Sequence, residues 1–348
     1  MEKMIPIIMD CDFNRLGLID QYISFIWTAR YYTCGDFVLT VDVNEQIKEW
    51  FKKDYYIVRD DDDHVGVIEK VEIEVREDSQ EIVTVSGRFL SSLLGRRIIA
   101  DQTQLNTTVS HGIYTLIQNN AIMPLLSARQ IPGLKIGNAT FTERLQVQYT
   151  GQNLLETIEE ICETYGLGFK TTLSEKNEMI FQLYKGEDRS YTQTSNPYVV
   201  FSDHAGNLIS SKYSEDYTST ISDVLVAGEG EGIERKKLWV GKASNTGLER
   251  YEYFHDRRDL STNNGEISEK DYQKQLKETG LEAITEVTTV FEGTVDFRSV
   301  EYKKDVFLGD ICVTEYTGWG IGINGRLVEV IESMSETGEY SINPTFGL

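Results

Sequence analysis

Apolar and polar side chains alternate along the first third of the chain, and this period of two is typical of half-buried β-strands. One face of the first long strand is apolar throughout, at Ile23, Phe25, Trp27, Ala29 and Tyr31. A polar turn at 33–36 separates it from a strand that carries Phe37, Leu39 and Val41. Further strands are predicted at 55–59, 65–76 and 81–86, with a short helix at 45–51. Residues 4–87 therefore predict an antiparallel sheet or barrel.

A helical period replaces this alternation at four later places, namely 87–99, 109–120, 153–166 and 268–280. The third is the clearest, because Asn153 can cap its start, Glu156 follows three residues later, and Gly166 can end it. The last has a cap signature at Ser268 and Asp271 but a thin apolar face of Tyr272 and Leu276. We expect the helix at 268–280 to lie on a surface or to contact a neighbour.

Strands return on both sides of these helices. The predicted ranges are 167–173, 179–184, 198–201, 208–217, 222–227, 235–240, 249–254, 285–296, 311–316, 327–333 and 340–346. The pattern predicts a mainly β protein with an α+β insert, divided into residues 1–99, 100–196 and 197–348. The first and last of these domains are β-rich, and the middle one packs helices on a small sheet.

One weak internal echo links the two ends of the chain. Gly35–Thr40 and Gly309–Thr314 share Gly-Asp, alternating apolar residues and a final Thr. Gly-Asp is common turn chemistry before any strand, so the match can be chance. It equally suits two related β-domains at the two ends.

Composition and charge narrow the function classes. The chain has 348 residues, 40% of them hydrophobic and 26% charged, which is ordinary globular usage. The net charge is −22, and this disfavours both broad nucleic-acid binding, which needs Lys and Arg, and an anionic membrane surface. The apolar run at 4–9 is too short for a signal peptide, and no stretch approaches a membrane span. We therefore expect synthesis and folding in a cytoplasm.

The search for chemistry finds no catalytic, cofactor-binding or metal-binding residues. Four cysteines, Cys11, Cys34, Cys162 and Cys312, are far apart and are expected to be free thiols. The histidines His64, His111, His204 and His255 form no HExxH motif, and no GxSxG occurs. Paired carboxylates such as Glu159-Glu160 carry little information among 56 acidic residues.

Two apparent motifs have simpler interpretations. Gly320–Gly325 matches GxGxxG, but a strand pattern follows it instead of a helix, so we predict a glycine-rich turn at Asn324-Gly325. In the acidic run Asp60–Asp63, a calcium loop counted from Asp61 would use Asp63, Val65, Gly66 and Glu72. Val65 supplies no side-chain oxygen and both flanks are strands, so a solvated hairpin tip is predicted.

A more specific likeness lies between residues 10 and 100. It is carried by Leu18-Ile19-Asp20-x-Tyr22, Ser24-x-x-Trp27-x-x-Arg30-Tyr31-Tyr32-x-x-Gly35-Asp36-Phe37, Asp54-x-Tyr56-Ile57, Val65-Gly66-Val67-Ile68-Glu69, Val85-Ser86-Gly87-Arg88-x-Leu90 and Leu94-x-Arg96-Arg97-Ile98-Ile99. Looser echoes follow at 153–169 and at Gly309-Asp310 and Asn343–Gly347. This segment resembles siphophage tail-hub proteins, a family that includes the baseplate hub and the N-terminal part of tail-associated lysins.

The resemblance implies a structural subunit of a phage tail tip. Each chain would carry two tail-tube-like antiparallel β-barrels flanking the mixed middle region, and a homotrimer would imitate a sixfold ring. The first and last domains would meet around that ring while the middle domain faces outward. The ring would join distal tail or tube proteins above to tip or fibre proteins below.

DNA would pass through this ring without specific binding, and no membrane insertion is expected. Acidic side chains lining the channel would repel phosphates, although acidity for solubility alone explains the charge equally well. Lytic and receptor-binding relatives carry such parts as appended domains, and nothing follows Leu348, so a hub alone, without enzyme activity, is expected. Two alternatives stay open: a receptor- or glycan-binding tail module, suggested by 19 Tyr and 4 Trp, and a peptidoglycan hydrolase of the tail.

Overall fold

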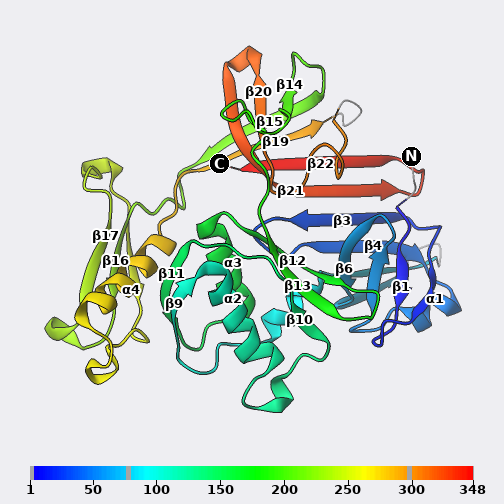
Figure 1. Cartoon of the computed structure of the whole chain (residues 1–348). Helices are drawn as coiled ribbons and strands as arrows, with labels where there is room; N and C mark the ends of the chain where they lie inside the picture. Colours follow the sequence, from blue (N-terminus) through cyan, green and yellow to red (C-terminus); the bar gives the residue numbers. More distant parts are fainter. Residues whose placement is uncertain (1–3, 76–79, 296–299, 348) are drawn as a thin grey trace.

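The computed structural model describes residues 4–75, 80–295 and 300–347. The predicted strand ends at Arg76 and Asp296, and the terminal Leu348, lie outside these ranges. The described strands form four sheets, of ten, seven, three and two strands (Figure 1). The predicted mainly β class is therefore confirmed. No helix among the described residues is both long and apolar enough to cross a membrane.

The ten-stranded sheet contains strands from both ends of the chain. Its main path runs β15-β19-β22-β21-β3-β4-β8-β7, and β14 and β20 extend it beside β21. The strands are β3 (Ser24–Arg30), β4 (Asp36–Asp42), β7 (Lys70–Val75), β8 (Glu81–Arg88), β14 (Val200–Ser202), β15 (Leu208–Asp216), β19 (Thr288–Val295), β20 (Ile311–Tyr316), β21 (Ile321–Ser335) and β22 (Tyr340–Gly347). The alternation seen in the sequence sets its core face, where Phe25, Trp27 and Leu39 are fully buried.

This sheet consists of two halves with the same topology. In the first half β3 pairs with β4, β4 with β8, and β8 with β7. In the second half β15 pairs with β19, β19 with β22, and β22 with β21. All of these pairs are antiparallel. In each half, the last strand in sequence (β8 or β22) pairs with the second strand (β4 or β19), so both halves have the same strand order. The predicted echo does not mark this repeat, because Gly35-Asp36 opens β4 whereas Gly309-Asp310 precedes β20, and the counterpart of β4 is β19.

The two halves meet where β3 pairs with β21. Seven consecutive antiparallel pairs run from Ser24–Ser335 to Arg30–Glu329. Figure 1 shows the blue β3 beside the red-orange β21, so the beginning and the end of the chain share one sheet. None of the described sheets closes into a barrel, and the predicted pair of barrels is not confirmed. The reason is that β3 and β21 pair with each other, which leaves β7 and β15 as separate edges at the two ends of the path.

The seven-stranded sheet joins the first third of the chain to the middle. Its order is β10-β13-β12-β6-β5-β1-β2, and a single pair, Thr172 with His64, links β12 to β6. The strands are β1 (Ile7–Met9), β2 (Arg15–Leu18), β5 (Tyr56–Arg59), β6 (Asp62–Val67), β10 (Leu134–Ile136), β12 (Gly168–Leu173) and β13 (Met179–Tyr184). The domain boundaries near residues 99 and 196 stay a prediction. The seven-stranded sheet combines strands from either side of residue 99, and the ten-stranded sheet combines strands from before residue 99 with strands from after residue 196.

The helices of the first half of the chain follow the sequence closely. The predicted segment 153–166 is α3 (Leu154–Tyr165): the Asn153 side chain accepts hydrogen bonds from the N–H groups of Leu155 and Glu156, and Gly166 ends the helix at φ 65°. The others are α1 (Glu45–Trp50), α2 (Val109–Ile117), its π-helical continuation η2 (Gln118–Ile122), and the 3-10 helices η1 (Leu90–Arg96) and η3 (Ser127–Arg129). In the segment 87–99, predicted as an amphipathic helix, residues 90–96 form a 3-10 helix, and residues 87 and 88 belong to β8. The two-stranded sheet pairs β9 (Thr103–Thr108) with β11 (Arg144–Tyr149).

A unit inserted between β15 and β19 has a core of its own. Three strands, β16 (Asp223–Ala227), β17 (Lys237–Gly241) and β18 (Glu252–Asp256), pack against α4 (Glu269–Glu282). Its apolar cluster consists of Val224, Val226, Val240, Leu260, Ile267, Tyr272 and Leu276, separate from the main core. We call residues 221–285 the satellite unit. The remaining 3-10 turns are η4 (Gly232–Glu234), η5 (Gly247–Glu249), η6 (Asn263–Gly265) and η7 (Thr317–Trp319).

The Asn153 cap allows a test of the local account of α3. Replacing Asn153 with Ala leaves two N–H groups of the first turn without an acceptor, so we expect a loss of about 1–2 kcal/mol in the free energy of unfolding. Urea denaturation followed by far-UV circular dichroism measures it. The exposed Asn138, in a loop, is the matched control, and Asn138→Ala should change stability by less than about 0.5 kcal/mol.

Candidate functional site

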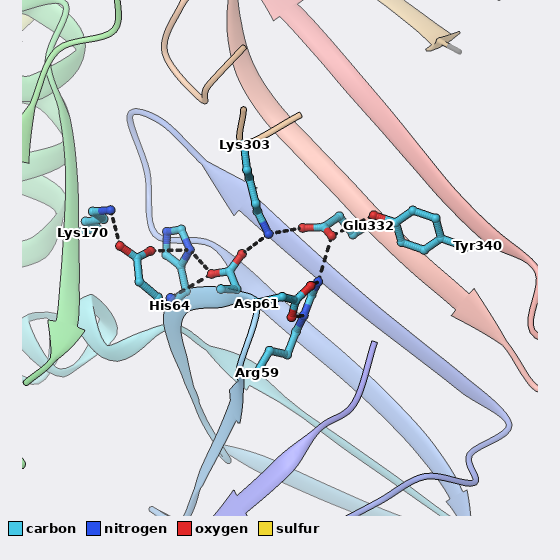
Figure 2. Close-up of polar contacts among 9 residues, drawn as sticks. Arg59, Asp61, His64, Lys170, Lys303, Glu332 and Tyr340 are labelled. Carbon is cyan, nitrogen blue, oxygen red and sulfur yellow. Dashed lines mark hydrogen bonds and ion pairs between the residues drawn. The ribbon is translucent and has the colours of Figure 1, made fainter. Parts of the chain in front are cut away.

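A group of interacting charged side chains lies where the three parts of the chain meet. We call it the junction cluster, and its members are Arg59, Asp61, Asp62, Asp63, His64, Lys170, Lys303, Glu332 and Tyr340 (Figure 2). The β5–β6 hairpin supplies the first five, β12 supplies Lys170, and β21 and β22 supply Glu332 and Tyr340. Lys303 comes from the loop before β20. The cluster therefore connects the first third, the middle and the last third of the chain.

Arg59 and Glu332 form the most deeply buried pair of this cluster. Their side chains are 1% and 5% exposed, and Arg59 Nη2 donates to Glu332 Oε2 over 2.9 Å. Arg59 also bonds to Asp61 and lies over the ring of Trp27, which is the residue paired with Glu332 across β3 and β21. Burial alone would lower the pKa of Arg59, but the bonds to Asp61 and Glu332 outweigh burial and raise it. Arg59 therefore stays charged and carries two carboxylates.

Asp62 is the second buried anion. Its side chain is 2% exposed, and it receives hydrogen bonds from His64 Nδ1 at 2.7 Å and Lys303 Nζ at 2.6 Å. Burial would raise the pKa of Asp62, but His64 and Lys303 outweigh it and hold the pKa far below its ordinary value. Lys303 Nζ also donates to Glu332 Oε1 over 2.8 Å, so one ammonium group bridges the β5–β6 hairpin and β21.

The structure confirms only part of the prediction that Asp60–Asp63 form a solvated hairpin tip. A hairpin does form, and Asp60 in its turn has a side chain that is 82% exposed. Asp62, predicted to be solvated with the rest, is buried instead. The difference arises because Lys303 and Glu332 are brought in from more than 200 positions away, and such pairing leaves no mark in the local pattern. One signal was present in the sequence. Glu332 lies two residues from Val330 and two from Met334, on the same face of the strand, and this spacing predicts a charged residue on the core face.

The cluster does not assemble the calcium loop considered for Asp61–Glu72. Asp61 is paired with Arg59, Asp63 with Lys170, and Glu72 lies on β7 beside Lys70. Asp62, Asp63 and His64 do offer ligand atoms within 4.8 Å of one another. Lys303 and Lys170 already neutralise these carboxylates, so the arrangement holds strands together instead of leaving anionic ligands for a cation.

A cavity of about 490 Å³ opens beside the cluster, and a second ionic joint lies on its wall. Asp310, 2% exposed, accepts hydrogen bonds from Arg189 Nε and from the N–H of Glu187, both over 2.7 Å. The Gly309-Asp310 pair thus ties the middle of the chain to the start of β20. Lysines and carboxylates both line this cavity, so it carries no uniform charge that would select an anion or a cation.

The remaining candidate residues are dispersed over the fold. Cys34, Cys162 and Cys312 are buried, and burial raises the pKa of Cys34 to about 12, whereas Cys11 is exposed; all four are free. The histidines occupy four different places: His64 on β6, His111 on α2, His204 in the turn after β14, and His255 on β18.

The glycine-rich segment 320–325 forms a β-hairpin with β20, as its strand pattern predicts, but the turn lies at Thr317–Gly320 and not at Asn324-Gly325. Asn324 and Gly325 pair with Val313 and Cys312 inside β21. Gly320 supplies the left-handed turn residue, with φ 65°. Gly325 leaves room for Phe346, whose Cβ would lie 2.8 Å from an added Cβ.

Known proteins are similar to this chain in both sequence and fold. The family model of Siphovirus ReqiPepy6 Gp37-like proteins matches residues 5–348. The chain belongs to this family. The solved structures that it resembles include the tail protein from Neisseria meningitidis MC58, with a TM-score of 0.58, 12% identity, and coverage of 100% of this chain and 97% of that one. The search of curated proteins returned no match.

Two prophage proteins give similar values. The 43 kDa tail protein of prophage MuSo2 from Shewanella oneidensis has a TM-score of 0.56 at 13% identity, covering 99% of this chain and 97% of that one. Prophage tail protein gp18 from Listeria monocytogenes EGD-e has a TM-score of 0.53 at 12% identity, covering 99% and 94%. At such identities the likeness establishes the shared fold. With the family assignment, it identifies this siphovirus protein as a structural component of the virion tail.

The buried pair predicts a large effect of a single substitution. Glu332→Leu leaves Arg59 and Lys303 without their shared buried partner, and we expect a loss of about 3–5 kcal/mol in unfolding free energy. Guanidinium denaturation measures it. The exposed pair Lys212–Glu292 supplies the control, and Glu292→Leu should cost less than about 1 kcal/mol. Equal effects of the two substitutions would contradict a structural role for the cluster.

The ion pairs of the hairpin also predict its response to calcium. Because Asp61 and Asp63 are each bound to a cationic side chain, we expect calcium up to millimolar concentrations to leave the near-UV circular dichroism unchanged. A saturable change in wild type that Asp63→Asn abolishes would show instead that the hairpin binds calcium.

Proposed function

We propose that three copies of this chain form a ring at the tail tip, joining the tail tube to the distal tip and surrounding the DNA-exit channel. The observation that carries the proposal is the repeated topology of the ten-stranded sheet. Each chain offers two four-stranded units, so three chains would place six equivalent units around one axis. The β21–β3 junction inside a chain is then the template for the contact between chains.

The free edges of the sheet support a repeated contact of this kind. In the first half β7 occupies the position that β21 has in the second, and β15 occupies the position of β3. A β7–β15 contact between neighbouring chains would therefore be antiparallel, as the β21–β3 pair is. It joins two different surfaces, which is the kind of interface that closes rings. It would also cover edge strands that single chains otherwise leave open.

The side chains of β7 support the same contact. All six residues of β7 are exposed, although Val71, Ile73 and Val75 continue the apolar core face of the sheet. Val71 extends the row Phe25, Leu39 and Val85 across four strands, yet it is 40% exposed, and Ile73 is 65% exposed. An apolar edge of this type calls for a partner.

The opposite face of the sheet has the chemistry of a channel wall for DNA. Hydroxyl groups predominate near its middle, where Thr40 bonds to Thr84 and Ser333 to Ser341. The positive charges on this face of β3, β7 and β8 are neutralised, since Arg30, Lys70 and Arg88 each pair with a carboxylate. Since no cation on the described part of these three strands is left unpaired, this region would give phosphates no strong contact, and DNA would slide past it.

We infer a structural role without enzyme activity and with protein partners above and below the ring. The best-developed cluster of ionisable groups is satisfied by its own ion pairs, which supports that inference. The segment Met123–Leu126 supports further partners, because it leaves Met123, Leu125 and Leu126 exposed by 72%, 94% and 62%. Attachment to other tail proteins would bury them.

The ring is tested by the mass of the purified chain and of one variant. We expect a trimer in mass photometry or sedimentation, shifting toward monomer in Ile73→Lys, because the new charge lies in the contact between chains. Ile233→Lys is the matched control: Ile233 is 97% exposed on the satellite unit, and its substitution should leave the trimer intact. Circular dichroism verifies folding of each variant. A wild type that stays monomeric at high concentration, alone and with its tail partners, would contradict the proposal.

A further inference from the structure

The satellite unit is attached to the rest of the molecule in an unusual way. Its apolar cluster is separate from the main core, and two chain segments connect it to β15 and β19. These segments touch in one two-bond bridge, Ile221 with Thr285. A cavity of about 410 Å³ lies beside the bridge. The connection thus has few fixed contacts and room beside it, as a hinge requires.

The satellite unit also contacts the body along a seam between α4 and β11. The sequence of β11 is that of a strand with one face toward water. Leu145, Val147 and Tyr149 point into the main core, while Gln146 and Gln148 alternate with them. In the structure, α4 lies against β11, between β11 and the satellite sheet (Figure 1), and both glutamines are buried. A surface-type face has been covered, which is typical of contacts that open and close.

The α4 side of the seam is polar as well. Gln275, Thr279 and Glu282 follow at helical spacing on one stripe, next to the stripe of Tyr272 and Leu276 that packs on the satellite sheet. Gln275 and Thr279 are fully buried, yet neither amide atom of Gln275 nor the hydroxyl of Thr279 has a hydrogen-bond partner within the described part of the chain. Gln148 Oε1 is in the same state. Burying unpaired polar atoms costs free energy, so these atoms weaken the packing of α4 on β11.

A few specific bonds hold the seam closed. Gln148 Nε2 donates to the carbonyl of Asp259 over 2.7 Å, and Arg257 Nη2 donates to the carbonyl of Gln148 over 2.9 Å. Tyr149 Oη donates to Glu282 Oε1 over 3.3 Å. Glu282 is the last residue of α4, where the negative end of the helix dipole disfavours a second negative charge.

We propose that the satellite unit is a hinged arm with a docked and an undocked state, and that protonation of Glu282 favours the docked state. This inference concerns the satellite unit alone and does not depend on the ring.

The charges facing Glu282 set the direction of the effect. Burial raises the pKa of Glu282 to about 8; Arg257 opposes this rise, and Glu160 on α3 and Glu278 on α4 add to it. Tyr149 and Tyr165 are the remaining titratable groups beside it, and burial raises the pKa of each. The docked state therefore holds a proton that the undocked state, with a carboxyl near its ordinary 4.5, releases. Docking is strongest in acid and weakens as pH rises from about 4.5 to about 8.

One other group near the seam titrates with the opposite sign. Burial, followed by Arg257, lowers the pKa of His255 below its ordinary 6.5, so charging His255 in acid would oppose docking. Its effect lies below pH 6.5 and so overlaps only the acid part of the range over which Glu282 acts. Removing the Glu282 carboxylate separates the two contributions.

Distance measurement between two spin labels tests the arm in the full chain. Ile233→Cys on the satellite unit and Leu125→Cys on the body are both exposed, and Cys11→Ser removes the exposed native thiol. Labelled chains are diluted with unlabelled chains so that distances within one chain dominate. Double electron–electron resonance should give one short distance near pH 5 and a second, longer one near pH 9. An identical distribution at both values would overturn the proposal.

Three variants identify the cause. Glu282→Gln keeps a neutral hydrogen-bonding group that cannot ionise, so the short distance should persist near pH 9, while the exposed Glu286→Gln should behave as wild type. Gln275→Leu removes an unpaired buried amide and should also favour the docked state at alkaline pH. If Glu282→Gln retains the wild-type pH response, Glu282 is not the switch. If Gln275→Leu opens the arm further, the account of the seam is wrong.

Discussion

The pairing of β3 with β21 is the constraint on which the rest of this structure depends. It places residues 24–30 beside residues 329–335, so that two four-stranded units from opposite ends of the chain become one sheet. The closure of such a long loop is entropically costly, and the ordinary ladder bonds are reinforced at one point. There Trp27 and Glu332 are paired, Arg59 lies over the Trp27 ring, and the same guanidinium bonds to Glu332. Lys303 and Asp62 extend that contact to the loop before β20 and to the β5–β6 hairpin.

Two regions outside the ten-stranded sheet differ in how firmly they are attached to it. The middle of the chain is fixed by a shared sheet, by Lys170 with Asp63, and by Arg189 with Asp310. Among the described residues, no sheet ladder joins the satellite unit to the body, and the two connecting segments meet at the Ile221–Thr285 bridge at the base of the unit. Its polar seam leaves buried amide groups without partners. Shared sheets and buried ion pairs therefore mark the frame, although Arg59 Nη1 and Trp27 Nε1 are also buried there without a partner among the described residues. The satellite unit differs from the frame in its separate apolar core, its narrow connection and its polar seam.

The sequence predicted what depends on local pattern. The alternation around Phe25 and Trp27, the Asn153 and Ser268 caps, and the end at Gly166 all have causes within a few residues of where they act. It did not predict the burial of Asp62, because the compensating Lys303 lies 241 positions away. Nor did it separate the satellite unit from the last domain, since the strands of both have the same alternation. The match of Gly35–Thr40 to Gly309–Thr314 fell on strands that are not equivalent, whereas the repeat in the structure is one of topology.

The equivalence of the β21–β3 and β7–β15 contacts is the central claim. It is tested most directly by a cryo-electron microscopy reconstruction of the tail tip without imposed symmetry. The account predicts three copies of this chain around the tail axis, with β7 of each copy antiparallel to β15 of the next and the hydroxyl-bearing face toward the channel. A tip holding another number of copies, or one in which β7 and β15 both face solvent, would contradict it.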